Sequence, residues 1–195
     1  MLFRSAEKIH ELRASPTTVH RGFFDASLKP VLTIDSGDVV RLWTTTGNPR
    51  YFESLGVQPE NIIYSDYTSQ ELYRAGASRG AIDPCFPAKI GISHVYNLIQ
   101  EKHRKKPLDV IFFDPAKKAI DFAPGIVIPT KPFWGVIGVA PPPSMGRVPS
   151  GPPNVFGGNM DNHDLQPGTS LFLPIHADGA LISIGDGHAL IRSIG

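Results

Sequence analysis

Glycine and proline interrupt the second half of the chain too often for long helices to form there. The 195-residue sequence contains 19 glycines and 19 prolines, which cluster between Pro124 and Gly187. Proline lacks a backbone donor and glycine weakens helices through its conformational entropy, so both favour turns between short elements. We therefore predict a mainly β protein of the α+β class, with a few short helices between its strands.

β-branched and apolar runs mark the predicted strands. Residues 31–43, VLTIDSGDVVRLW, predict two short strands around a turn at 35–38. Helical spacing of apolar residues predicts a helix over 92–103, and a short helix is predicted over 69–77. The proline-rich stretch 141–153 is predicted to be a loop outside any central sheet strand. Further strands are predicted at 108–114, 125–129, 135–140, 170–175 and, after a turn at 176–179, at 180–185.

Composition and charge exclude several classes of protein. Hydrophobic residues make up 41% and charged residues 19% of the chain, which is typical of a globular protein. Lys and Arg total 19 against 18 for Asp and Glu, a net charge of +1, so binding to nucleic acid through phosphate neutralisation is not expected. The basic run KHRKK (102–106) is interpreted as a solvated helix end.

The expected location is the cytoplasm. No apolar run approaches the roughly 18 residues of a membrane span, and the first residues lack the apolar core of a signal peptide. The single cysteine, Cys85, allows no intrachain disulfide and no CxxC zinc site, which fits a reducing compartment.

The common motifs of nucleophilic catalysis and phosphate binding are absent from the sequence. There is no GxSxG, and Cys85 lies in DPCFP without a neighbouring base, so a structural or surface thiol is the favoured interpretation. The glycine-bearing strings GVIGVA and GPPNVFGG match neither GxGxxG nor a P-loop.

Carboxylates and imidazoles gather instead in two glycine-flanked strings, GGNMDNHD (157–164) and GDGH (185–188). Carboxylate and imidazole together suit zinc or a similar divalent cation. The alternative is that Asn-Asp and Asp-Gly merely form turns. For Asp161 and His188 both interpretations stay open. A plain surface role is favoured for the other side chains near these strings, namely His163, Asp164 and His176.

The same strings occur in a known family. TVHRGFFDASLKPVLTIDSGDVV (18–40), APGIVIPTKPFWGVIGVAPPP (123–143) and residues 146–189 resemble the acetamidase/formamidase family of metal-dependent amidases. The ordered strings PFxGxIGVAP, GGNMD and SxGDGHA carry the resemblance, which covers roughly the first 50 and the last 75 residues.

The resemblance implies one acetamidase/formamidase-like domain over 1–195 with sheets of the β-sandwich or barrel type. Within it we distinguish a β-rich N-terminal part (1–50), a divergent helical middle (51–107) and a β-rich part that carries both motifs (108–195). The domain is expected to be incomplete. The family continues after GDGHA with a Gln-Gly-Asp-Gly-Glu string, whereas this sequence reads LIRSIG.

The activity implied by the resemblance is hydrolysis of small linear amides, formamide or acetamide, to a carboxylate and ammonia by metal-activated water. Asp161 and His188 are the expected ligands of a divalent metal, which we expect to be zinc. His94 is a third expected ligand, although the predicted helix over 92–103 conflicts with that role. Asn159 and Asp186 are the expected catalytic residues, with Asn159 orienting the water or the substrate oxygen. A homo-oligomer is also implied.

Two alternatives remain open. The absent acidic segment is consistent with a catalytically inactive, truncated remnant. The chain could also be a β-domain that binds a sugar or a partner through its polar loops, with aromatic rings stacking on the ligand; core packing is the favoured role for those rings, Trp43, Trp134 and Phe156.

Overall fold

Short strands, turns and irregular loops make up almost all of the described chain. The computed structural model describes residues 8–20, 22–44, 53, 56, 58, 90–94, 108–112 and 116–188. A three-residue 3-10 helix, η3 (Pro143–Met145), follows the buried Pro141. The mainly β class is thereby confirmed. The helix predicted over 69–77, Cys85 and the basic run 102–106 lie outside the described residues.

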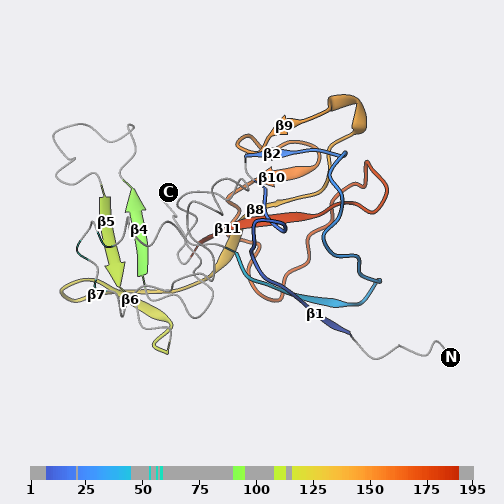
Figure 1. The fold of residues 1–195 in the computed structure, drawn as a ribbon. Coiled ribbons are helices and arrows are strands. Elements are labelled where there is room, and N and C mark those ends of the chain that lie inside the picture. The colour runs from blue at the N-terminus through green and yellow to red at the C-terminus, as the bar shows by residue number, and fades with distance from the viewer. Residues whose placement is uncertain are drawn as a thin grey trace.

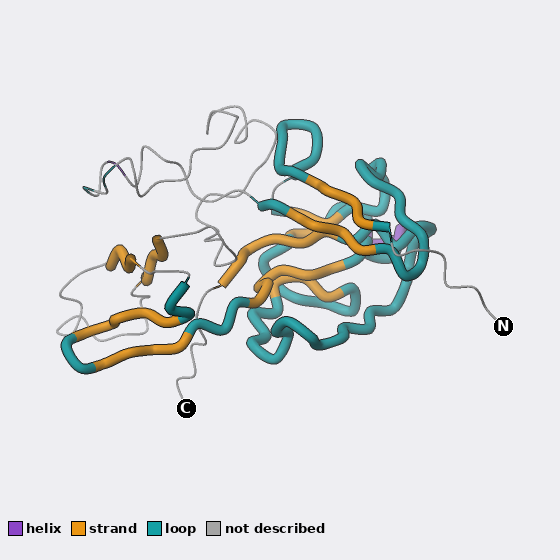
Figure 2. Tube along the Cα trace, turned by 90° about the horizontal axis from the view of Figure 1, so that it is seen from below, coloured by secondary structure: helices purple, strands orange, loops and turns teal. Residues whose placement is uncertain are grey.

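The strands pair in small sheets around a three-stranded antiparallel sheet of order β10-β8-β11 (Figure 1). Four two-stranded pairs accompany it: parallel β1–β3 and antiparallel β2–β9, β4–β5 and β6–β7. Figure 2 shows the β6–β7 ribbon extending away from the body. The strands are β1 (Ile9–Leu12), β2 (Phe23–Phe24), β3 (Val39–Leu42), β4 (Ile90–His94), β5 (Leu108–Phe112), β6 (Ala119–Ala123), β7 (Ile126–Pro129), β8 (Phe133–Gly138), β9 (Val148–Pro149), β10 (Gly157–Asn159) and β11 (Ser183–His188).

The hydrophobic core lies against one face of the three-stranded sheet. Phe24, Val139 and Phe156 are its buried centre, and the Phe24 and Phe156 rings lie 5.4 Å apart in a tilted arrangement. Gly138 lets this packing occur, because a Cβ there would lie 2.7 Å from the Phe24 ring. Phe156 therefore packs in the core, as the sequence favoured.

β8 has a second face, which points away from the core cluster of Phe24, Val139 and Phe156. Side chains alternate between the faces of a strand. Val136 packs against the core cluster, and Gly138 faces the Phe24 ring. Phe133 and Gly135 therefore face the other side of the sheet, where the candidate site lies.

Three strand predictions agree with the structure, with small shifts in their bounds. The runs at 108–114, 125–129 and 135–140 correspond to β5, β7 and β8, although β8 begins two residues earlier, at Phe133. The strand predicted at 180–185 is displaced to β11, Ser183–His188. The proline-rich loop supplies only η3 and the two-residue β9, which pairs with β2 and stays out of the three-stranded sheet.

Other predictions are wrong. Residues 92–94 are not helical but belong to β4, which pairs with β5, while 95–103 lie outside the described residues. Of the two strands predicted within 31–43, the first is absent and the second is β3. β3 pairs in parallel with β1, and just before β3 the His10 imidazole forms a hydrogen bond with Asp38 at 2.6 Å.

The predicted strand at 170–175 is also wrong. This segment runs without strand pairing, and the Phe172 side chain is 90% exposed. Pro174 removes one donor from any ladder the segment could join. The turn after it is confirmed, since the Ala180 amide donates to the Ala177 carbonyl at 3.1 Å. Among the described residues, no helix has the length and apolar character needed to cross a bilayer.

Candidate metal centre

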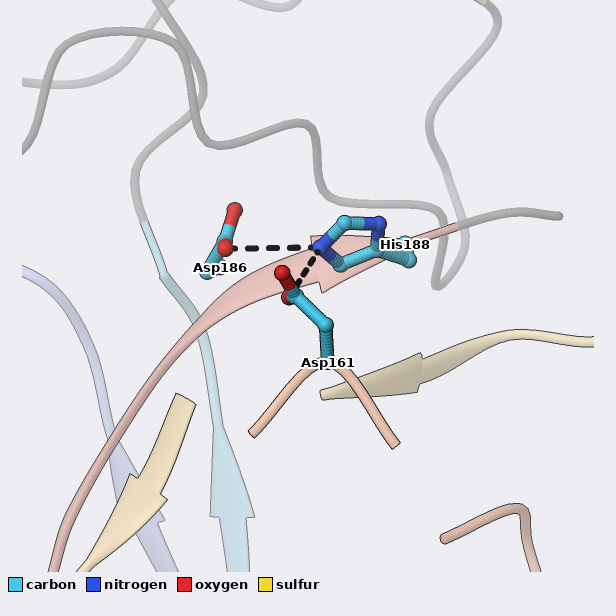
Figure 3. Close-up of side chains that lie close together, drawn as sticks. All are labelled: Asp161, Asp186 and His188. Carbon is cyan, nitrogen blue, oxygen red and sulfur yellow. Dashed lines mark hydrogen bonds and ion pairs between the residues drawn. The ribbon is translucent and has the colours of Figure 1, made fainter. Parts of the chain in front are cut away.

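Two carboxylates and an imidazole converge beside β8. Asp161 lies in the loop after β10, whereas Asp186 and His188 belong to β11 (Figure 3). The His188 Nε2 atom lies 3.2 Å from Asp161 Oδ1 and 3.3 Å from Asp186 Oδ2. All three ligand atoms lie within 4.8 Å of one another.

Both aspartates have left-handed backbone, and hydrogen bonds to β8 hold the loop that carries Asp161. Asp161 and Asp186 have left-handed φ angles of 47° and 55°. Such a conformation costs about 1–3 kcal/mol for a residue other than glycine and persists only where its surroundings enforce it. The amides of Met160 and Asp161 both donate to the Gly135 carbonyl, at 2.9 and 3.1 Å. This double contact holds the turn that aims Asp161.

His188 is positioned by its neighbour across the sheet. It pairs with Phe133 in the β11–β8 register. Their rings stack at 4.9 Å with planes 12° apart, and Phe133 is buried. Ring stacking on a buried partner limits the rotation of the imidazole. His188 thus presents Nε2 to the carboxylates.

The carboxylates make this position favour positive charge. The hydrogen bond that the Asp186 carboxylate accepts from His188 raises the pKa of His188 above its ordinary value, and the negative charges of Asp186 and Asp161 add to the effect, while partial burial opposes it. The His188 side chain is 36% exposed. Either a proton on His188 or a bound cation would supply the charge that the two carboxylates favour.

The three ligand atoms surround the position where Gly135 has no Cβ. A Cβ built there would lie 2.6 Å from Asp161 Oδ1, 2.7 Å from His188 Nε2 and 2.9 Å from Asp186 Oδ2. Two carboxylate oxygens and one imidazole nitrogen are ligands that divalent cations accept. The residues present therefore fit a divalent cation.

The structure groups the predicted residues differently from the sequence. It brings together Asp161 and His188, the two expected ligands, and adds Asp186, which was expected to be catalytic. Asn159 lies in β10 opposite Val136, and its buried Oδ1 has no hydrogen-bond partner among the described residues. His94 ends β4, and its side chain lies outside the described part of the chain.

The remaining candidates do not join the group. His163 and Asp164 contact each other at 3.2 Å, and the Asp164 side chain is 79% exposed, in keeping with a surface role. His176 differs from the surface expectation, because its Nε2 is buried without a hydrogen-bond partner in the described structure. Sequence reasoning missed Gly135. A glycine inside an apolar strand, as in PFWGVIG, is the signal of close approach that could have indicated it.

Three crystal structures share this fold over nearly the whole chain. A predicted acetamidase/formamidase from Thermoanaerobacter tengcongensis matches with a TM-score of 0.65 at 23% identity over 95% of this chain. An acetamidase from Bacillus halodurans matches with a TM-score of 0.63 at 24% identity over 92% of this chain. An acetamidase from Yersinia enterocolitica matches with a TM-score of 0.64 at 22% identity over 95% of this chain. The chain spans 63%, 63% and 62% of their respective lengths.

A family model matches a different part of the chain. Residues 41–115 are similar to the CoA enzyme activase uncharacterised domain, DUF2229. This segment is less than half of the chain, largely coincides with the divergent middle, and contains none of the three converging residues. Proteins of curated function give no match. The chain thus shares its fold with acetamidase and acetamidase/formamidase crystal structures.

Proposed function

We propose that this chain hydrolyses small linear amides, such as formamide or acetamide, to a carboxylate and ammonia. The observation that carries the proposal is the convergence of Asp161, Asp186 and His188 beside Gly135. The shared fold supports the same substrate class, because the similar crystal structures are described as acetamidases or as an acetamidase/formamidase.

Asp161, Asp186 and His188 would hold a divalent cation, which we expect to be zinc because zinc accepts carboxylate and imidazole ligands. The observed separations from His188 Nε2 to the two carboxylate oxygens are 3.2 and 3.3 Å. When bound, such a cation polarises the amide carbonyl and lowers the pKa of water toward neutrality.

Proton transfer is assigned to Asp186. An amide loses its nitrogen only after that nitrogen gains a proton, so a group must take a proton from water and deliver it. Asp186 directs Oδ2 at His188, and its other oxygen, Oδ1, points away from that contact (Figure 3). We assign Oδ1 this role. Asn159, whose buried Oδ1 has no hydrogen-bond partner in the part of the chain that the structure describes, is the candidate for orienting the water.

The first experiment measures metal and turnover together. The purified chain should contain about one zinc per chain and release ammonia from formamide or acetamide, and a chelator should stop the release. Asp161→Ala and His188→Ala should each lose both properties. Asp164→Ala is the matched control, since its exposed carboxyl lies in the same loop and should change neither.

Two further outcomes separate the alternatives. Unchanged metal content in both alanine variants would refute the site. Bound metal without ammonia release from either amide would favour a non-catalytic binding domain. Asp186→Asn keeps a ligand oxygen but cannot accept the proton, so it should retain zinc and lose turnover by about 100-fold or more.

A further inference from the structure

We infer that Gly135 is a positioning residue whose missing side chain keeps the cation site open. This inference rests on the proposed function, because it concerns the same site. It assigns a role to a residue that is neither a ligand nor a proton carrier. The inference rests on the space beside the Cα of Gly135, where a Cβ would meet the three ligand atoms. The carbonyl of Gly135 shows in addition how the same residue holds Asp161.

The carbonyl of Gly135 aims Asp161. It accepts hydrogen bonds from the amides of Met160 and Asp161, and these bonds hold Asp161 in its left-handed conformation. Any residue in β8 could provide this carbonyl. The contact therefore explains why the loop returns to β8 at this point, but it does not by itself require glycine.

The space beside the Cα of Gly135 is what requires glycine, because a Cβ does not fit there. A Cβ would approach the ligand atoms of Asp161, Asp186 and His188 to within 2.6–2.9 Å, closer than real Cβ atoms approach such neighbours. One methyl group would thus contact all three atoms at once. It would occupy the space on which they converge and push their side chains apart.

The fold itself should tolerate that methyl group. Gly135 lies within β8 and has no left-handed φ, so alanine can adopt its backbone. The atoms that a Cβ would meet belong to side chains and not to the backbone, and the two carboxylates can turn aside even though stacking on Phe133 limits the imidazole. The cost of Gly135→Ala should therefore fall on the convergence of the ligands and hardly on the stability of the fold.

Two other glycines of the same sheet provide matched controls. Gly185 of β11 pairs with Val136 of β8, and a Cβ on Gly185 would meet none of the described residues within 4 Å. Gly138 is also in β8, but a Cβ there would meet the buried Phe24 ring at 2.7 Å. The three alanine variants thus add the same methyl group to the metal site, to open space and to the core.

The test measures zinc affinity by calorimetry and the Tm of the metal-free protein in chelator. Gly135→Ala should bind zinc at least about 10-fold more weakly, while its metal-free Tm stays within about 3 °C of the wild type. Gly185→Ala should change neither quantity. Gly138→Ala should lower the metal-free Tm by more than Gly135→Ala does.

The outcomes distinguish this inference from the proposed function. If the wild type binds zinc and Gly135→Ala binds it equally well, the role of Gly135 is wrong and the metal site stands. If the wild type binds no divalent cation, both are overturned. If Gly135→Ala does not fold, the double variant with Asp161→Gly removes the nearest clash and should restore folding. Failure to restore it would show that Gly135 serves the fold instead.

Discussion

Asp161 and Asp186 hold their carboxylates on left-handed backbone, at φ 47° and 55°. Asn and Asp tolerate this region better than most residues, but an alanine there is strained. The two aspartates therefore combine a ligand oxygen with a conformation that few other side chains adopt readily. The strain is expected to be part of how the site is aimed.

Replacing Asp161 by glycine or by alanine separates the ligand from the backbone. Both variants lose the carboxylate, but only alanine keeps a Cβ in the left-handed conformation, at a cost of about 1–2 kcal/mol. In chelator, Asp161→Gly should therefore be more stable than Asp161→Ala by about 1 kcal/mol, or about 2–4 °C in Tm. Equal Tm values would argue against the left-handed backbone at this position.

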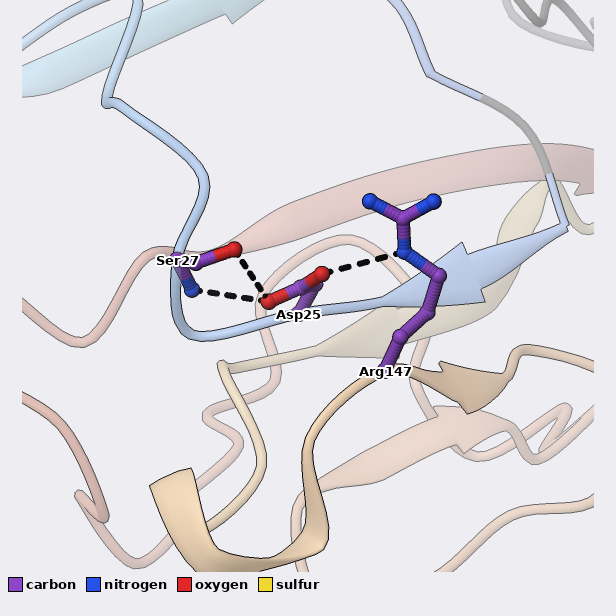
Figure 4. A network of polar contacts seen from close by, with 3 residues as sticks. All are labelled: Asp25, Ser27 and Arg147. Carbon is purple, nitrogen blue, oxygen red and sulfur yellow. Dashed lines mark hydrogen bonds and ion pairs between the residues drawn. The ribbon is translucent and has the colours of Figure 1, made fainter.

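Asp25 ties β2 to the loop before β9 and is a second informative carboxylate (Figure 4). Its oxygens accept bonds from the Ser27 hydroxyl at 2.7 Å, the Ser27 amide at 2.8 Å and Arg147 Nε at 3.0 Å. The bonds from Ser27, followed by the contact with Arg147, lower the pKa of Asp25 from 3.8 to about 2. The Asp25 side chain is only 11% exposed.

This shift predicts a specific loss of stability in acid. Because the folded state keeps Asp25 ionised down to a pKa of about 2, whereas the unfolded chain protonates it near 3.8, the contribution is present above that value. It should disappear as the pH falls from about 4 to 2. Asp25→Asn should lower Tm at pH 6 and lose that difference from the wild type in acid, measured by thermal melts. Asp178→Asn, on an exposed turn, should melt like the wild type throughout.

At the scale of elements, the core face of the β10-β8-β11 sheet carries the packing. Phe156 is 1% exposed and packs against Phe24 and Val139. Phe156→Ala should therefore lower the free energy of unfolding by about 3–5 kcal/mol. Phe172→Ala is the control: that ring is 90% exposed, so its removal should change stability by no more than about 0.5 kcal/mol. Denaturant unfolding measures both. Similar losses in the two variants would contradict the assigned core.

The elements also show where periodicity alone fails. Residues 92–103 have helical spacing, yet 92–94 belong to β4, because β5 offers a strand partner. Residues 170–175 have strand composition yet stay unpaired. Hydrophobic pattern describes which side chains seek burial, but strand formation depends on a partner that is distant in sequence. Neither the partner of 92–94 nor the lack of a partner for 170–175 can be recognised from the segment itself.

At the scale of the whole molecule, metal binding should stabilise the fold. The three candidate ligands lie in β11 and in the loop after β10, and both β10 and β11 pair with β8. A cation that binds only the folded chain adds about 2.7 kcal/mol at 100 times its Kd. For a chain of this length that corresponds to a rise in Tm of about 5–10 °C.

The measurement is a thermal melt at increasing zinc concentration. Wild type and Asp164→Ala should show the rise, and His188→Ala should not. A rise that persists in His188→Ala would place the cation elsewhere in the molecule.

The class of structure and the chemistry of the candidate ligands could be predicted from the sequence. Frequent glycine and proline allow only short elements, and GGNMD and GDGH supply carboxylates and an imidazole on flexible backbone. These properties are local, so they can be predicted from neighbouring residues. The resemblance to acetamidases and formamidases, which rests on the same strings, also indicated the fold that the crystal structures share.

Which of these groups meet follows from the pairing of strands that are distant in sequence. Asp161 reaches Asp186 and His188 because β10 and β11 pair with opposite edges of β8, and Gly135 leaves room between them. Asp186 joined the two expected ligands for that reason, while His163 and Asp164 stayed at the surface. Strand pairing and register are nonlocal, so no single segment of the sequence encodes the site.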